Sequence, residues 1–311
     1  MTSTPQNHRP RNFIGHLANW ITLPRFVFAI VLTFFLTGIL FPFYWMASSS
    51  FKTYAEIGGR RIQTAGFKPV FIPSALNTEA FEELFDPNHP SFQNFGRSII
   101  NTVKVSVPTA FVAVILSTLG SYAIARLRFR GKELLINSVL LIYLFPGVLL
   151  IIPLFAMLAQ IGDRLGFDVQ DNLVILIITY LAQTLPVALY MLTNYFRTIP
   201  HEIEQAGLID GCSRMGVFWR ITLPLAVPAL VSVTIYTLMI AWNEFLYAIV
   251  FMNDHNMYTM PIKINFIWNQ PTPRPHVVMA ASTIMTIPIL ILFLGLERYL
   301  AEGLSAGGVK G

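Results

Sequence analysis

The chain has 311 residues, of which 54% are hydrophobic and 12% are charged. A soluble domain carries roughly 25% charged residues, so much of this surface never meets water. The formal net charge of +5 would suit nucleic acid or anionic lipid, and the long uncharged runs favour the membrane over nucleic acid. The single cysteine, Cys212, excludes an intrachain disulfide, and no Cys/His cluster surrounds it that would form a structural zinc site.

Six uncharged stretches are long enough to cross the ~30 Å hydrocarbon core, which takes about 20 apolar residues in a helix. In chain order they are Phe26–Phe51, Val105–Ala125, Leu134–Gly162, Asn172–Phe196, Ile221–Asn243 and Pro275–Leu296. The first is longer than a signal-peptide core of about 7–15 residues, so we expect a retained helix. Prolines inside several stretches predict kinks within continuing helices, because neighbouring helices can satisfy the freed carbonyls.

Arginine and lysine gather in alternate connections, which predicts the orientation of the chain. The basic segments are the tail 1–25, the connection after the second stretch, the connection 197–224 and the C-terminal tail 301–311. Both termini are therefore predicted in the cytoplasm, on either side of an all-α membrane domain at 26–300. The loops 52–97 and 253–276 are then outside, and Glu79–Phe85 in the first of them is predicted as a short amphipathic helix.

The connection 197–224 is too polar for the membrane core and is predicted as a helix–turn–helix on the cytoplasmic face. Pro200 suits the start of a helix, and Glu202 and Glu204 place acid in its first turn. Gly211 interrupts, and a second helical piece runs from Ser213 to Ile221.

This connection resembles the EAA loop of binding-protein-dependent ABC importer permeases. The family pattern is Glu-Ala-Ala, three residues, Gly, nine residues and then Ile-x-Leu-Pro. The chain keeps the spacing, but its triplet is Gln205-Ala206-Gly207, and the carboxylate of Glu204 lies one residue earlier. The resemblance implies that the first helix docks into a cleft on an ATP-binding subunit, with small residues allowing close approach; the alternative is a surface helix with no partner. The implied coupling residues are Gln205, Ala206, Gly207, Asp210, Gly211, Ile221, Leu223 and Pro224.

Three further stretches resemble the carbohydrate-uptake branch of this family, in particular its maltose-type (MalG-like) permease: Ser121–Lys132, Ala241–Leu246 and Glu302–Gly311. The resemblance implies a type I importer permease fold with six transmembrane helices in the inner membrane. It also implies a second permease (MalF-like), two ATP-binding subunits (MalK-like), an external solute-binding protein that contacts the loop 253–276, and a C-terminal tail between the ATP-binding subunits. The implied substrate is a di- or oligosaccharide.

The fifth apolar stretch continues past Glu244 through Phe245–Met252, so Glu244 is the only carboxylate deep within a predicted span. Ionisable residues in a membrane usually face the bundle interior or a wet cavity, so Asn243, Glu244 and Tyr247 are candidates for a sugar path. The alternative is a structural role, in which Glu244 joins its span to a neighbouring one by hydrogen bonds.

The sequence contains no G-x-x-x-x-G-K-[ST] motif, so the chain has no P-loop of its own. No cofactor is expected in this chain, and ATP and magnesium are assigned to the partner subunits. No catalytic or metal-ligand constellation stands out, which speaks against a membrane-embedded enzyme. An ion-gradient-driven secondary transporter remains the alternative; its expected marks are paired intramembrane charges and inverted repeats, and we find neither.

Overall fold

The computed structural model describes residues 25–57, 70–89, 92, 94–144, 146–272 and 274–308, and in these residues it consists of helices and turns without a strand. The long helices are α2 (Arg25–Ser50), α4 (Phe95–Arg126), α5 (Lys132–Leu144), α6 (Gly147–Leu165), α7 (Leu173–Thr198), α11 (Val227–Asn243) and α14 (Pro275–Gly308). The short ones are α3 (Glu79–Phe85), α8 (His201–Ile209), α9 (Arg214–Val217), α10 (Leu223–Leu225), α12 (Leu246–Phe251) and α13 (Met260–Trp268), with a π-helical turn, η2, over Phe218–Thr222. The predicted all-α class and the helix at 79–85 are confirmed.

Five of these helices, α2, α4, α6, α7 and α14, are long and apolar enough to cross a membrane. A sixth span forms if Arg214–Leu225 and Val227–Asn243, which meet at a bend of 72°, are taken together. Six spans are thus consistent with the structure. As predicted, proline does not end the helix at Pro42, Pro108, Pro153, Pro186 or Pro288.

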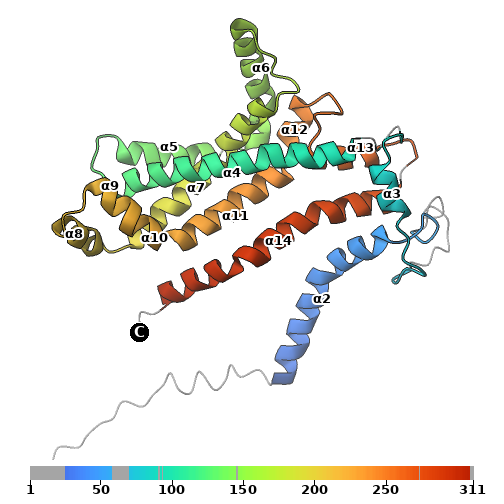
Figure 1. The fold of residues 1–311 in the computed structure, drawn as a ribbon, viewed down its shortest axis with the longest axis horizontal. Coiled ribbons are helices and arrows are strands. Elements are labelled where there is room, and N and C mark those ends of the chain that lie inside the picture. Colours follow the sequence, from blue (N-terminus) through green and yellow to red (C-terminus); the bar gives the residue numbers. More distant parts are fainter. Residues whose placement is uncertain are drawn as a thin grey trace, which may run out of the picture.

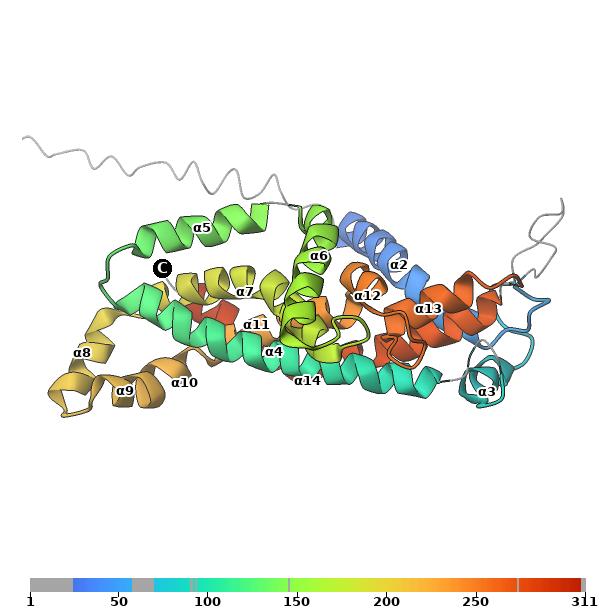
Figure 2. The ribbon, with the colours of Figure 1, turned by 90° about the horizontal axis from the view of Figure 1, so that it is seen from above.

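The prediction of one continuous third helix over Leu134–Gly162 is wrong. The chain forms α5, which ends at Leu144, and α6, which begins after Pro146. Proline has no backbone N–H and disfavours the helical region for the residue before it, so Pro146 separates the two helices. Figures 1 and 2 show the result, because α5 runs beside α7 whereas α6 points away from the bundle.

The centre of the bundle is the contact between α4 and α7, with α11 packed against both. The face of α4 in this contact is built from small residues, which let the two backbones approach closely. A side chain at Gly120 would lie 2.8 Å from the Leu189 Cδ2 atom. At the next residue, the Ser121 hydroxyl donates a hydrogen bond of 2.9 Å to the Leu189 carbonyl. The polar and small residues within the apolar stretch Val105–Ala125 thus serve helix packing.

One end of the bundle carries α3 and α13, and the opposite end carries α8 and α9 (Figure 1). At the α13 end, the Asn101 side chain donates to the carbonyls of Asn256 and Tyr258, at 2.8 and 3.2 Å. An ion pair between Arg274 and Glu83 fastens α3 to the start of α14. The predicted outer loops 52–97 and 253–276 therefore meet in one cap over the bundle.

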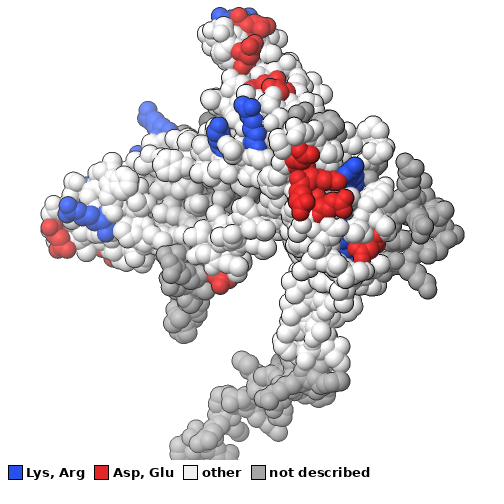
Figure 3. All heavy atoms as spheres, turned by 45° about the vertical axis from the view of Figure 1, so that its right-hand side comes forward, with Lys and Arg blue, Asp and Glu red and all other residues white. Residues whose placement is uncertain are grey.

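Figure 3 shows charged side chains at the hairpin end, on the projecting α6 and at the α3–α13 end, and α2 carries no charged residue after Arg25. The first 24 residues and residues 309–311 lie outside the described part of the chain, so the tail 1–25 is seen only at its last residue. The predicted tail 301–311 continues α14 as far as Gly308, and α14 ends on the same side of the bundle as α8 (Figure 1).

Candidate functional site: the α8–α10 hairpin

The segment 200–225, here called the hairpin, forms the predicted helix–turn–helix. Pro200 precedes α8, whose first turn holds Glu202 and Glu204. Gly211 ends the turn with a φ of +88°, a conformation that strains residues with a Cβ atom. The Ser213 hydroxyl then caps α9 by accepting a hydrogen bond of 3.1 Å from the Gly216 amide. The interruption predicted at Gly211 thus has a backbone cause.

Gly207 lies where the two arms of the hairpin touch. It is buried, and a Cβ atom there would lie 2.5 Å from the Ile221 Cδ1 atom and 3.3 Å from the Val217 Cγ2 atom. The sequence interpretation placed the small residues against another subunit. The structure instead assigns Gly207 to a contact within the chain, whereas Ala206 and Gly211 are exposed.

A buried ion pair anchors the hairpin to the bundle. The Arg126 Nε atom at the end of α4 lies 2.8 Å from the Glu204 Oε1 atom, and the two side chains are only 5% and 11% exposed. The same carboxylate oxygen accepts a hydrogen bond of 3.0 Å from the Thr222 hydroxyl. The Arg126 Nη2 atom also donates to the Ile199 carbonyl at 2.8 Å. One carboxylate therefore joins α4, α8 and η2.

Sequence reasoning missed this network. It interpreted Arg126 as a sign of membrane orientation within the family-like stretch Ser121–Lys132, and Glu204 as acid in the first turn of the helix and as a displaced family carboxylate. The available signal was the spacing of Glu204 and Gly207, which places both on one face of a helix. Both residues are buried in the structure, whereas their neighbour Gln205 is exposed.

The hairpin exposes several large apolar side chains among its charged ones. Ile209 is 86% exposed, Met215 61% and Trp219 57%. Among the predicted coupling residues, Gln205, Ala206, Asp210, Gly211 and Pro224 are exposed as well, whereas Ile221 and Leu223 are half-buried. Large exposed apolar side chains outside a membrane span are candidates for contact with a partner protein.

The second group of candidates lies where the fifth span breaks. Glu244 has an extended backbone and separates α11 from α12. Its Oε1 atom accepts a hydrogen bond of 2.8 Å from the Tyr247 amide, and its Oε2 atom accepts one of 3.1 Å from the Ala248 amide. The carboxylate thus caps the first turn of α12, where backbone N–H groups have no helical partner.

This arrangement corrects the expectation of a continuous helix through Glu244. The structural interpretation of Glu244 foresaw hydrogen bonds to a neighbouring span. The two hydrogen bonds to backbone amides stay within its own span, and the carboxylate also interacts with the side chain of Tyr180 on α7. Tyr247 makes a further link to another helix, because its hydroxyl donates to the Gly147 carbonyl at 3.2 Å. The exposed Asn243 amide donates to the Met239 carbonyl of its own helix.

A cavity of about 480 Å³ opens beside this break between α6 and α7. Of the three predicted path residues, Tyr247 lines it and Asn243 and Glu244 do not. Its wall consists of Gly147, Leu150, Pro153, Leu154, Met157, Thr179, Ala182, Gln183, Pro186 and Tyr247.

Residues 117–306, which include the hairpin and the broken fifth span, match the family described as binding-protein-dependent transport system inner membrane component. The chain belongs to this family. It is therefore a multi-pass permease of the cytoplasmic membrane, in a transport system that depends on a binding protein.

Curated relatives align with this permease over most of their length. It is 38% identical to the inner membrane ABC transporter permease protein YcjP of Escherichia coli (strain K12), over 93% of this chain and 98% of YcjP. It is 33% identical to the trehalose transport system permease protein SugB of Mycobacterium tuberculosis (strain CDC 1551 / Oshkosh), over 88% of this chain and 93% of SugB.

The fold also matches a solved structure. A chain of a bacterial ABC transporter involved in the import of the acidic polysaccharide alginate superposes with a TM-score of 0.70, at 21% identity, over 95% of this permease and 99% of that chain. The predicted ABC importer permease fold is thereby confirmed.

Proposed function

We propose that this permease moves a carbohydrate inward and receives the driving movement through its hairpin. The observation that carries this proposal is the combination of an exposed apolar tip with a rigid base. Ile209, Met215 and Trp219 offer a surface for an ATP-binding subunit, and the Arg126–Glu204 pair fixes that surface to α4. A push on the tip is then transmitted as a rigid-body movement of the spans.

The proposed assembly contains a second permease (MalF-like), two ATP-binding subunits (MalK-like) that bind ATP and magnesium, and a solute-binding protein over the cap formed by α3 and α13. The carbohydrate class follows from the similarity to the trehalose permease SugB and from the resemblance of Ala241–Leu246 to the carbohydrate branch. An ion-gradient-driven transporter is not favoured, because the carboxylate of Glu244, which such a protein would use, caps α12.

The proposal is tested by placing a charge on the hairpin tip. In the complex purified from membranes with its ATP-binding subunits, Ile209→Asp should abolish both co-purification of those subunits and ATP-dependent sugar uptake into proteoliposomes. The matched control is Ile72→Asp at the opposite end of the molecule, where the side chain is 73% exposed. If Ile209→Asp retains the ATP-binding subunits and normal uptake, the hairpin is not the coupling surface.

A further inference from the structure

Polar side chains recur along one face of α7. Thr179, Gln183, Tyr190, Asn194 and Arg197 follow each other at intervals of three, four or seven residues, which places them in one stripe of an α-helix. Gln183 lies close to the middle of the span Leu173–Thr198, and Arg197 lies in its last turn. This face is called the α7 stripe below.

The last four residues of the stripe lack side-chain partners in the described part of the chain. Gln183, Tyr190, Asn194 and Arg197 are exposed, and their side chains form no hydrogen bond or ion pair with the described residues. Amide and guanidinium groups are costly in hydrocarbon unless they are hydrogen-bonded. Another face of α7 presents the exposed apolar side chains of Val174 and Ile178, which suit lipid. The stripe is therefore not built to face lipid.

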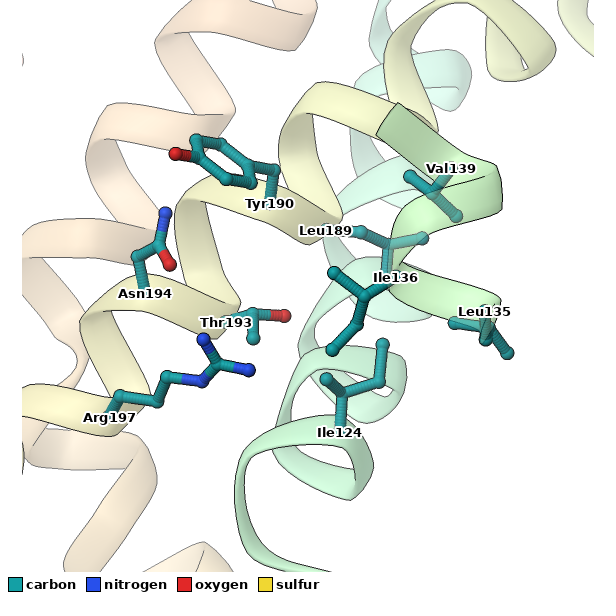
Figure 4. Close-up of a pocket in the computed structure, with 9 residues that line it drawn as sticks. All are labelled: Ile124, Leu135, Ile136, Val139, Leu189, Tyr190, Thr193, Asn194 and Arg197. Atoms are coloured by element: carbon teal, nitrogen blue, oxygen red, sulfur yellow. The ribbon is translucent and has the colours of Figure 1, made fainter. Parts of the chain in front are cut away.

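Two hollows open on the stripe, one after the other. Thr179 and Gln183 line the cavity of about 480 Å³ beside α6 and Tyr247. Farther along α7, Tyr190, Asn194 and Arg197 line a smaller pocket of about 40 Å³. Figure 4 shows these residues on α7: the Arg197 guanidinium is directed toward the side of Ile136 and Val139 of α5, whereas the Tyr190 ring and the Asn194 amide are directed away from α5. The hollows follow α7 from the middle of the span to its hairpin end.

From this arrangement we infer that the α7 stripe is this subunit's wall of the translocation path and contacts the carbohydrate directly. The amides of Gln183 and Asn194 both donate and accept hydrogen bonds, as sugar hydroxyls require. The ring of Tyr190 and the apolar side chains across the pocket suit the C–H faces of a sugar ring. Arg197 is the one charged residue that lines either hollow, so the wall accepts neutral or acidic carbohydrates and repels cationic solutes.

This inference rests on the proposed function and moves the sugar contacts from Asn243 and Glu244 to α7. The competing occupant of the stripe is the second permease, whose spans would cover the polar groups and exclude water. The two occupants differ in whether water reaches the stripe in the assembled transporter.

Cysteine labelling in the assembled transporter measures this access. In a Cys212→Ser background, Gln183→Cys and Asn194→Cys are treated in proteoliposomes with a small, charged, membrane-impermeant methanethiosulfonate reagent. We expect both to react, and the matched control Ile178→Cys, 50% exposed on the apolar face of the same helix, to stay unmodified. If neither stripe cysteine reacts, the inference is overturned in favour of a protein interface. If Ile178→Cys is labelled as strongly as the stripe cysteines, water reaches both faces of α7 and the assignment of the path to the stripe fails.

Uptake measurements decide whether the sugar touches the stripe. Gln183→Ala and Asn194→Ala should each lower uptake about fivefold while ATP hydrolysis continues, since each removes one hydrogen bond of about 1 kcal/mol. Ile178→Ala should leave uptake intact. The probe is the sugar that the wild-type complex imports from a set of trehalose, maltose and cellobiose. Unchanged uptake in both stripe variants would refute direct contact. If the wild type imports none of the three, the carbohydrate proposal fails, and the labelling still decides whether α7 lines a path.

Discussion

At the scale of single residues, Arg126 and Glu204 show how this permease departs from its family pattern without losing an anchored hairpin. The carboxylate lies one residue before the family position and turns inward. There it meets Arg126 of α4, and the exposed Gln205 is left on the outer surface. Gln205, which is exposed beside the proposed docking surface, is thus neutral. The negative charge of Glu204 pairs with Arg126 inside the chain.

This arrangement predicts a specific pattern in a double-mutant cycle. Glu204→Met or Arg126→Met alone should destabilise the hairpin by about 3–5 kcal/mol, because each leaves a buried group without its charged partner. The double variant Arg126→Met/Glu204→Met should be less damaging than either single change, because no buried charge remains. Protease sensitivity of the hairpin in the purified complex measures the effect. Gln205→Glu, one residue away and exposed, serves as the control, and additive losses in the cycle would argue against the pair.

Lys263 predicts a pH response at the opposite end of the molecule. It lies on α13 with 1% of its surface exposed, and burial lowers its pKa from 10.5 to about 8. Between these two pH values the unfolded chain binds more protons than the folded one, so stability rises with pH from about 8 to 10.5.

Thermal unfolding of the detergent-solubilised complex should therefore occur at a higher temperature at pH 9.5 than at pH 7.5. Lys263→Met should stabilise the protein at pH 7.5 and remove that difference. The exposed Lys104 provides the matched variant, Lys104→Met, which should keep the full pH response. If the unfolding temperature of Lys263→Met still rises between pH 7.5 and pH 9.5, other titratable groups cause the pH dependence.

At the scale of elements, the hairpin holds its shape because α8 meets η2 at a glycine. The nearest atom to a side chain at Gly207 is the terminal Cδ1 of Ile221, at 2.5 Å. An added methyl group would therefore push the two arms apart, unless that terminal atom is removed.

The expected result is a rescue. Gly207→Ala should lower ATP-coupled uptake, and Gly207→Ala/Ile221→Val should restore part of it, because valine lacks the Cδ1 atom. Gly211→Ala should not be rescued by Ile221→Val, because its strain of roughly 1–2 kcal/mol comes from the backbone. Uptake per transporter, measured at equal complex content, tests both pairs. Equal rescue of the two glycine variants would contradict this explanation.

At the scale of the whole molecule, the bundle has two distinct ends joined by long apolar helices. The apolar window of α2 is 0% buried, so α2 must be covered by lipid or by another subunit in the membrane. The basic connections and the hairpin occupy one end, and α3 and α13 occupy the other (Figure 1). The excess of arginine at the hairpin end predicts that this end lies in the cytoplasm.

Two single-cysteine variants test this orientation. In a Cys212→Ser background, Ile72→Cys should react with an impermeant maleimide on spheroplasts, and Ile209→Cys should react only after the membrane is opened. Both side chains are highly exposed in this chain, at 73% and 86%, and the permease is expressed without the ATP-binding subunits that are proposed to cover Ile209. Reaction of Ile209→Cys on sealed spheroplasts would invert the predicted topology.

Local patterns were enough to predict much of this protein. Apolar runs predicted the membrane helices, and the amphipathic helical pattern of Glu79–Phe85 predicted α3. Pro200 and Gly211 marked the limits of α8. Each of these signals acts through neighbouring residues, because helix formation, capping and membrane insertion depend on the local sequence.

The tertiary structure decided which of these elements touch. Arg126 and Glu204 are 78 residues apart in the sequence, so only the packing of α8 against α4 could show that they pair. The same holds for the alignment of the two hollows along α7. Glu244 and Pro146 were visible in the sequence, but whether a polar residue or a proline breaks a span depends on what its freed backbone groups can reach. The sequence by itself determined which stretches are apolar enough to enter the membrane and where the hairpin lies. The fold decided where the spans break, which side chains face each other and which are left for sugar, lipid and partner.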